Sequence, residues 1–216
     1  MSWTITSKYE HILRPVIQEA DRKNILMFGA ASDQGYNVAS KVYPAEYEQV
    51  FCIGAAKSTG RADSAAELQA KYVFPGGEWS DIKAEIGAGD GTLDHAWGSS
   101  FATALASGLA ALILDCTELV GYGKSYRKKI RTRENMDAIF AGMVREKESK
   151  YIPVTQHFTA EVAAGSWDTE GKQKFKKAMK NILRYYPRTF FLPLPASLRT
   201  LFKANIMVLG QLSTKT

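Results

Sequence analysis

The chain has 216 residues, of which 45% are hydrophobic and 23% charged, a composition typical of a soluble globular domain. Its formal net charge of +6 permits an anionic partner without requiring one. Two cysteines, Cys52 and Cys116, are too few for a disulfide framework and lie in no metal-ligand spacing, so we expect reduced, buried thiols and neither a metal nor a cofactor. The first residues contain no continuous apolar run of the kind found in signal peptides, which predicts a cytoplasmic location.

The amino-terminal part of the chain alternates helical and strand-like segments. Residues 7–23 carry an apolar stripe at helical spacing, with Pro15 inside it and Asn24 at its end. Three short apolar runs, typical of strands buried on both faces, then follow at 25–31, 50–56 and 71–74. This alternation predicts an α/β fold of three layers, in which a parallel sheet lies between helices.

A further helix is predicted after His95, where Gly98, Ser99 and Ser100 precede a run of small and apolar residues. The uncharged run ends at Asp115 and is shorter than the ~20 residues that span a bilayer core, so we predict a buried helix within the domain. Alanines recur along it at helical spacing, which allows neighbouring backbone to approach closely.

Two serines at the start of a helix have two explanations. Serine is a preferred capping residue, because its hydroxyl accepts a hydrogen bond from a free amide of the first turn. A hydroxyl at this place also lies at the positive end of the helix dipole, where free amides stabilise a developing oxyanion. Two adjacent hydroxyls leave one of them available after capping, so the residue types allow either role.

The surrounding residues resemble a known family. The segment 98–104, followed by the Ala-Ala-Leu-Ile run at 110–113, is similar to the nucleophile motif of the subtilisin-like serine proteases. Three further segments resemble motifs of that family in the same order: 28–35, 43–55 and 74–76. The resemblance runs from about Ile12 to Phe140. It implies a subtilisin-like fold and a serine endopeptidase activity on polypeptide substrates.

The resemblance also implies roles for two residues. Ser100 falls where the family has its acylating serine, whose own amide is one oxyanion donor, and Asp33 falls where the family has an asparagine that is the other donor. An ionised carboxylate accepts hydrogen bonds and donates none, whereas a protonated Asp33 would donate. Loss of one such donor lowers turnover by ~10²–10³-fold. Ser99 in place of threonine and Ala104 in place of proline are milder departures.

The aspartate and histidine motifs that the family places upstream do not occur in this sequence. Only His11, His95 and His157 are present, and we expect His95, five residues before Ser100, to have no catalytic duty. The resemblance therefore implies a catalytic domain that is incomplete on its N-terminal side, with the triad partners in another chain or segment. The alternative is a catalytically inactive remnant, or an interaction module that binds an acidic partner or a membrane through its basic tail. In both cases we expect little or no peptidase activity from this chain alone, because a serine without a base is a poor nucleophile.

The carboxyl-terminal part has a different character. We predict helices at 126–130 and 132–144, and divide the chain into residues 1–150, the catalytic-domain part, and residues 151–216, a basic extension of unknown role. Within the extension, 172–186 forms a basic amphipathic pattern, and no acidic residue occurs from Lys172 to Lys203. Such a helix can bind an acidic partner or an anionic membrane, but we favour a helix docked on its own domain. No nucleic-acid motif accompanies the charge, so we expect no nucleic-acid partner.

Overall fold

A three-stranded parallel sheet forms the centre of the computed structural model. It consists of β1 (Met27–Ala30), β2 (Val50–Ala56) and β3 (Tyr72–Pro75) in the order β1-β2-β3. Met27 pairs with Val50, and Ile53 pairs with Tyr72. Nearly every residue of the three strands is buried, which confirms the three strand segments and explains their continuous apolar sequence.

The structure describes residues 1–5, 7–33, 42–57, 69–76, 98–144, 150–158 and 169–185. The chain divides into two units, Met1–Tyr186 and Pro187–Thr216, and all described residues belong to the first. His95 and residues 34–41 lie outside the described residues.

The helices lie close to where the sequence predicts them. A short 3-10 turn (Ser7–Tyr9) leads into α1, which ends just before Asn24, a residue with a positive φ of 52°. The helices at 99–119, 124–130, 133–143 and 169–183 lie within a few residues of the predicted segments, whereas the sequence analysis predicts no helix at 154–157. The helices are α1 (Glu10–Arg22), α4 (Ser99–Leu119), α5 (Lys124–Ile130), α6 (Arg133–Met143), α7 (Val154–His157) and α9 (Thr169–Leu183).

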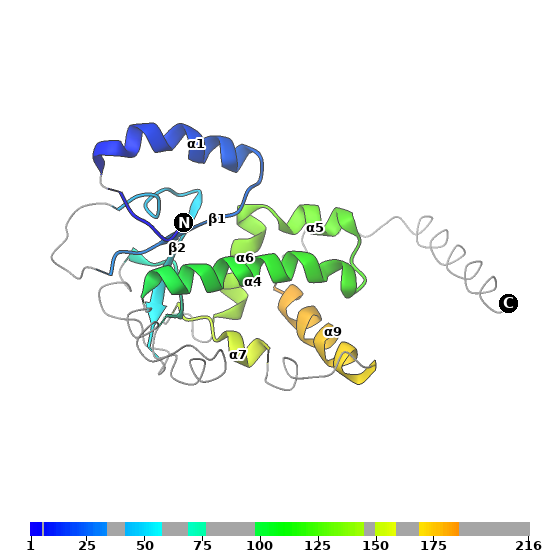
Figure 1. The fold of residues 1–216 in the computed structure, drawn as a ribbon. Helices are drawn as coiled ribbons and strands as arrows, with labels where there is room; N and C mark the ends of the chain where they lie inside the picture. The colour runs from blue at the N-terminus through cyan, green and yellow to red at the C-terminus, as the bar shows by residue number, and fades with distance from the viewer. Residues whose placement is uncertain are drawn as a thin grey trace, which may run out of the picture. The chain divides into compact units, whose positions relative to one another are not determined.

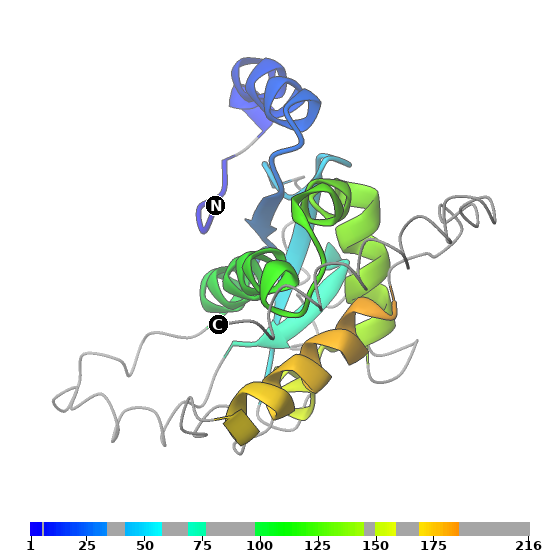
Figure 2. The ribbon, with the colours of Figure 1, turned by 90° about the vertical axis from the view of Figure 1, so that its right-hand side faces the viewer.

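Helices lie on both sides of the sheet, as the predicted three layers require: α4 and α6 cover one face, and α1 packs against the amino-terminal ends of β1 and β2 on the other (Figures 1 and 2). Ile17 of α1 packs in a cluster with Met27 and Val50. On the opposite face, α4 contacts all three strands. By length and composition α4 could cross a membrane, but Ala102 and Ala106 on its sheet side are fully buried, as we expect for a core helix.

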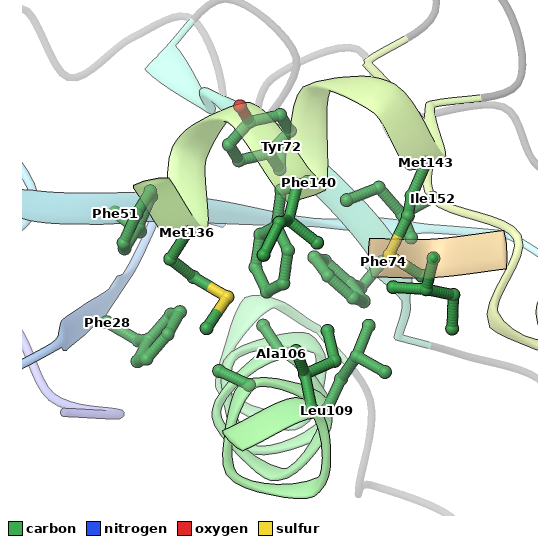
Figure 3. Packing of buried hydrophobic residues seen from close by; sticks show 14 of the residues in the cluster. Phe28, Phe51, Tyr72, Phe74, Ala106, Leu109, Met136, Phe140, Met143 and Ile152 are labelled. Carbon is green, nitrogen blue, oxygen red and sulfur yellow. The ribbon is translucent and has the colours of Figure 1, made fainter. Parts of the chain in front are cut away.

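The core between the sheet, α4 and α6 centres on Phe140 (Figure 3). This α6 side chain is 0% exposed, and four aromatic rings from the three strands surround it. The centroid of its ring lies 6.2 Å from that of Phe28, 5.9 Å from Phe51, 5.6 Å from Tyr72 and 5.6 Å from Phe74. Such offset and edge-on pairs add to the apolar area that the rings bury. Phe140 therefore ties α6 to every strand.

Polar contacts fix α6 at the edge of the sheet. The Tyr72 hydroxyl donates to Asp137 Oδ1 at 2.8 Å, and Lys71 Nζ lies 2.7 Å from the same oxygen. Burial raises the pKa of Tyr72, and the Asp137 carboxylate raises it further. Both cysteines are buried as predicted, and burial raises the pKa of the Cys52 thiol to about 12.

The core does not stop at residue 150. Tyr151 forms a parallel bridge with Val73, and Ile152 is fully buried in the same cluster as Phe140. Met179 of α9 joins this cluster, so α9 docks on its own domain, as we favoured from the sequence. The core thus contains residues from both sides of the predicted boundary at 150, and the division into a catalytic-domain part and an extension stays a prediction.

We predict that Phe140→Ala lowers the free energy of unfolding by about 3–5 kcal/mol, because it removes a ring that contacts all three strands and leaves a cavity. Phe101→Ala serves as the control, since Phe101 of α4 is 39% exposed, and it should change stability far less. Urea unfolding followed by circular dichroism measures both. Equal effects of the two substitutions would contradict the central role of Phe140.

Candidate active site

Gly98, Ser99 and Ser100 lie where the carboxyl ends of the strands meet the amino-terminal end of α4. The Gly98 amide donates to the Gly76 carbonyl at 2.6 Å, and the Gly76 amide donates to the Ala56 carbonyl at 3.0 Å. The ends of β2 and β3 therefore hold the start of α4 in place. A Cβ on Gly76 would lie 2.5 Å from the Ala55 Cβ, so the close approach requires glycine there. Ligand sites in open parallel sheets form at this carboxyl edge.

Asp33, which follows β1, binds Ser99 through both of its carboxylate oxygens. The Ser99 amide lies 2.9 Å from Oδ2 and 3.2 Å from Oδ1, and the Ser99 hydroxyl donates to Oδ1 at 2.6 Å. We call this set of hydrogen bonds the Asp33–Ser99 clamp. It places a carboxylate at the positive end of the α4 dipole, where negative charge is stabilising. The clamp thus satisfies a free amide of the first turn with an acid from another segment of the chain.

The clamp depends on the glycine that precedes it. Gly98 has a φ of 109°, a conformation that residues with a side chain rarely adopt. A Cβ built on Gly98 would lie 2.6 Å from Asp33 Oδ2. Both the backbone conformation and the space beside the carboxylate therefore require glycine at this position.

Ser100 is the exposed one of the two serines, whereas Ser99 is completely buried. The Ser100 hydroxyl donates to the Ser2 carbonyl at 3.0 Å. Its amide has no acceptor among the described residues, as expected of a first-turn N–H. Ser100 therefore combines an accessible hydroxyl with an amide that is available to a developing oxyanion.

The first residues of the chain place Ser2 beside Ser100. The Met1 nitrogen donates to the Phe28 carbonyl at 2.7 Å, and the Ala30 amide donates to the Met1 carbonyl at 3.2 Å. This is the hydrogen-bond pattern of a parallel ladder, so Met1 continues the sheet for one residue beyond β1. Ser2 is a contact that the sequence analysis missed, because nothing in the local pattern links residues that are 98 positions apart.

The structure brings Asp33 and Ser100 to the same end of α4, but it leaves the base unidentified. Asp33 accepts its bonds from Ser99, and its predicted place in an oxyanion hole stays a prediction. In the described part of the chain, no histidine forms a hydrogen bond with Ser100. His11 is exposed on α1, and His157 Nε2 lies 3.0 Å from the Met143 carbonyl. Over the same described ranges, no three His, Cys, Asp or Glu side chains gather as a metal site.

Comparison with protein families agrees with this geometry. The sequence model of the subtilase family, Peptidase S8, matches residues 1–130, which is more than half of the chain. The chain therefore belongs to the subtilase family of serine proteases. The match starts at residue 1 rather than near Ile12, and it stops at residue 130 rather than near Phe140. Comparisons with curated proteins and with solved structures give no match.

We predict that Gly98→Ala destabilises the protein more than Gly121→Ala, by about 1–2 kcal/mol, the usual contribution of a helix cap. Both glycines have a positive φ, and both substitutions introduce backbone strain. Only Gly98 faces Asp33, because a Cβ on Gly121 would meet nothing within 4 Å. Chemical unfolding of the two variants measures the difference. Equal losses would mean that the clamp adds nothing to stability.

Proposed function

We propose that the chain supplies the nucleophile of a subtilisin-like serine endopeptidase. In this proposal, Ser100 Oγ attacks the carbonyl carbon of a peptide bond while its proton passes to a base. The C–N bond then breaks, the proton moves to the leaving amine, and water releases the acyl group from Ser100. The observation that carries the proposal is an exposed Ser100, at the start of α4, whose amide has no acceptor in the part of the chain that the structure describes. The family of the chain supports the reaction class.

The base in this proposal comes from a second polypeptide segment that adds to the sheet beside β1. β1 is an edge strand of the described sheet, and Met1 pairs with it over one residue only. A strand edge is a template for another strand, and an added segment would displace Met1 from the Phe28 carbonyl and the Ala30 amide. Such a segment would run parallel to β1 and so reach the carboxyl edge of the sheet, where Ser100 lies.

The surface of α1, near the amino-terminal end of β1, fits a polypeptide partner. Ile12 is 63% exposed and Val16 is 62% exposed, and together with Tyr9 they form an apolar stripe on α1. A hollow of about 400 Å³ lies beside the stripe. Its lining residues are Pro15, Val16, Glu19, Ala20, Lys23 and Ile25. Contiguous exposed apolar side chains of this kind mark interaction surfaces.

Asp33 limits the rate that this site can reach. In its clamp the carboxylate accepts bonds from Ser99, so the Ser100 amide is the one oxyanion donor that the proposal uses. An asparagine at this position would still accept from Ser99 through its side-chain carbonyl and would add an N–H donor. Since one oxyanion donor usually changes the rate by ~10²–10³-fold, Asp33→Asn should accelerate acylation by that factor.

A second candidate is a catalytically inactive member of the family. Two contacts favour it: Asp33 places an acceptor beside the start of α4, and the Ser100 hydroxyl is bonded to the Ser2 carbonyl. In this case the chain keeps the shape of the site for stability or for partner binding.

Labelling with a fluorophosphonate probe tests the proposal on the purified chain. Without added base we expect little labelling, and imidazole should restore it by replacing the missing base. Mass spectrometry should locate the label on Ser100, and Asp33→Asn should label faster. Ser100→Ala should remove the label, whereas Ser107→Ala, which changes a partly exposed serine farther along α4, should retain it. If imidazole activates neither the folded unmodified chain nor the folded Asp33→Asn variant, the inactive candidate would be supported instead.

A further inference from the structure

The two faces of α9 differ in what they contact. Its apolar face, with Met179, Ile182 and Leu183, is buried in the core of the domain. Phe175 adds a ring contact with Phe158 at a centroid distance of 6.2 Å. Since this face is already occupied, the helix cannot insert it into a second partner without leaving the domain. Any partner of the docked helix must therefore bind its other face.

The other face of α9 is a row of cations. Lys172, Lys176 and Lys180 follow one another at spacings of four residues and so lie along one side of the helix, with Lys177 beside them. Arg184, the first residue after the helix, lines the same hollow as Lys176 and Lys180. All five are exposed, and in the described part of the chain none of them forms an ion pair. We call this set the α9 basic face. A shallow hollow of about 360 Å³ lies along it.

This arrangement is unfavourable without an anionic partner. Like charges four residues apart on a helix repel each other, and the basic face contains two such pairs in succession. The ion pair between Lys174 and Glu170, at 2.9 Å, involves neither the row nor Lys177. A surface of negative charge placed against the face would relieve the repulsion along the row of lysines, which is about 12 Å long at 1.5 Å per residue.

The charge of the whole chain is distributed in the same sense. Residues 172–216 contain ten Lys and Arg and no Asp or Glu. The whole chain has 28 Lys and Arg and 22 Asp and Glu, so the first 171 residues carry 18 cationic and 22 acidic side chains. A strong asymmetry of this kind indicates binding to a membrane or a polyanion.

The sequence after α9 distinguishes between these two partners. Residues 190–212 are rich in Phe, Leu and other apolar residues, interspersed with Arg199 and Lys203. Aromatic and aliphatic side chains next to cations partition to the interface of a bilayer, whereas a soluble polyanion has no apolar interior to receive them.

We propose that the α9 basic face binds the surface of a membrane that contains anionic lipids. The helix lies along the headgroups with its apolar side still packed on the domain, so the association is peripheral and electrostatic. The proposal concerns a surface formed by α9 and is independent of the chemistry of Ser100.

Co-sedimentation of the full chain with vesicles tests this inference. We expect binding to vesicles of phosphatidylcholine with phosphatidylserine and not to vesicles of phosphatidylcholine alone. Binding should weaken as salt is added, because ions screen exposed charges. The triple variant Lys176→Glu, Lys177→Glu, Lys180→Glu should partition at least about 100-fold less, since each lysine near an anionic surface contributes about a factor of five to ten.

The matched control replaces three exposed lysines of α5 by glutamate and so changes the net charge by the same amount. Its substitutions are Lys124→Glu, Lys128→Glu and Lys129→Glu. It should bind nearly as well as the unmodified chain, and circular dichroism should show that both variants are folded. Equal losses in the two variants would overturn the assignment to α9. Binding without phosphatidylserine, or binding of soluble polyglutamate in the absence of vesicle binding, would overturn the membrane as the partner.

Discussion

The hydrogen bonds between Asp33 and Ser99 are the interaction on which the site depends. They connect the end of β1 to the start of α4, two segments that are 66 positions apart in the sequence. This connection fixes the start of α4 from the β1 side, while the bond from the Gly98 amide to the Gly76 carbonyl fixes it from the β3 side, and Ser100 is thereby held next to the carboxyl edge of the sheet. The clamp also occupies the Ser99 amide and hydroxyl, so the neighbouring residue Ser100 is the one that stays accessible.

The same carboxylate that stabilises the helix limits the chemistry. An acid at the positive end of α4 is favourable for folding, but it can only accept hydrogen bonds when it is ionised, whereas catalysis of acyl transfer needs donors. Stability and activity therefore make opposite demands on position 33. The rest of the fold meets the structural demand: Phe140 joins α6 to all three strands, and α4, whose first turn forms the site, packs in the same core cluster.

The sequence predicts those features that local pattern determines. The run at 50–56 is apolar at every position except Gly54 and is observed as β2 with the same bounds, because a strand buried on both faces needs no alternation. The family motif locates Ser100 at the start of α4. In contrast, the Ser2 contact, the clamp and the extension of the core beyond residue 150 join distant segments, and each depends on a tertiary arrangement that no local spacing encodes. The helical spacing of Met179 and its neighbours did indicate a packed face, but not the surface that it packs against.

A double-mutant cycle between Asp33 and Ser99 tests the central claim most directly. Asp33→Ala, Ser99→Ala and the double variant are compared with the unmodified chain by chemical unfolding. Ser99→Ala keeps the backbone amide and removes the hydroxyl, so the cycle measures the bond between the Ser99 hydroxyl and Asp33 Oδ1, for which the coupling energy should be about 1–2 kcal/mol. A coupling energy indistinguishable from zero would show that Asp33 and Ser99 act independently, which contradicts the account of how this helix and its exposed serine are positioned.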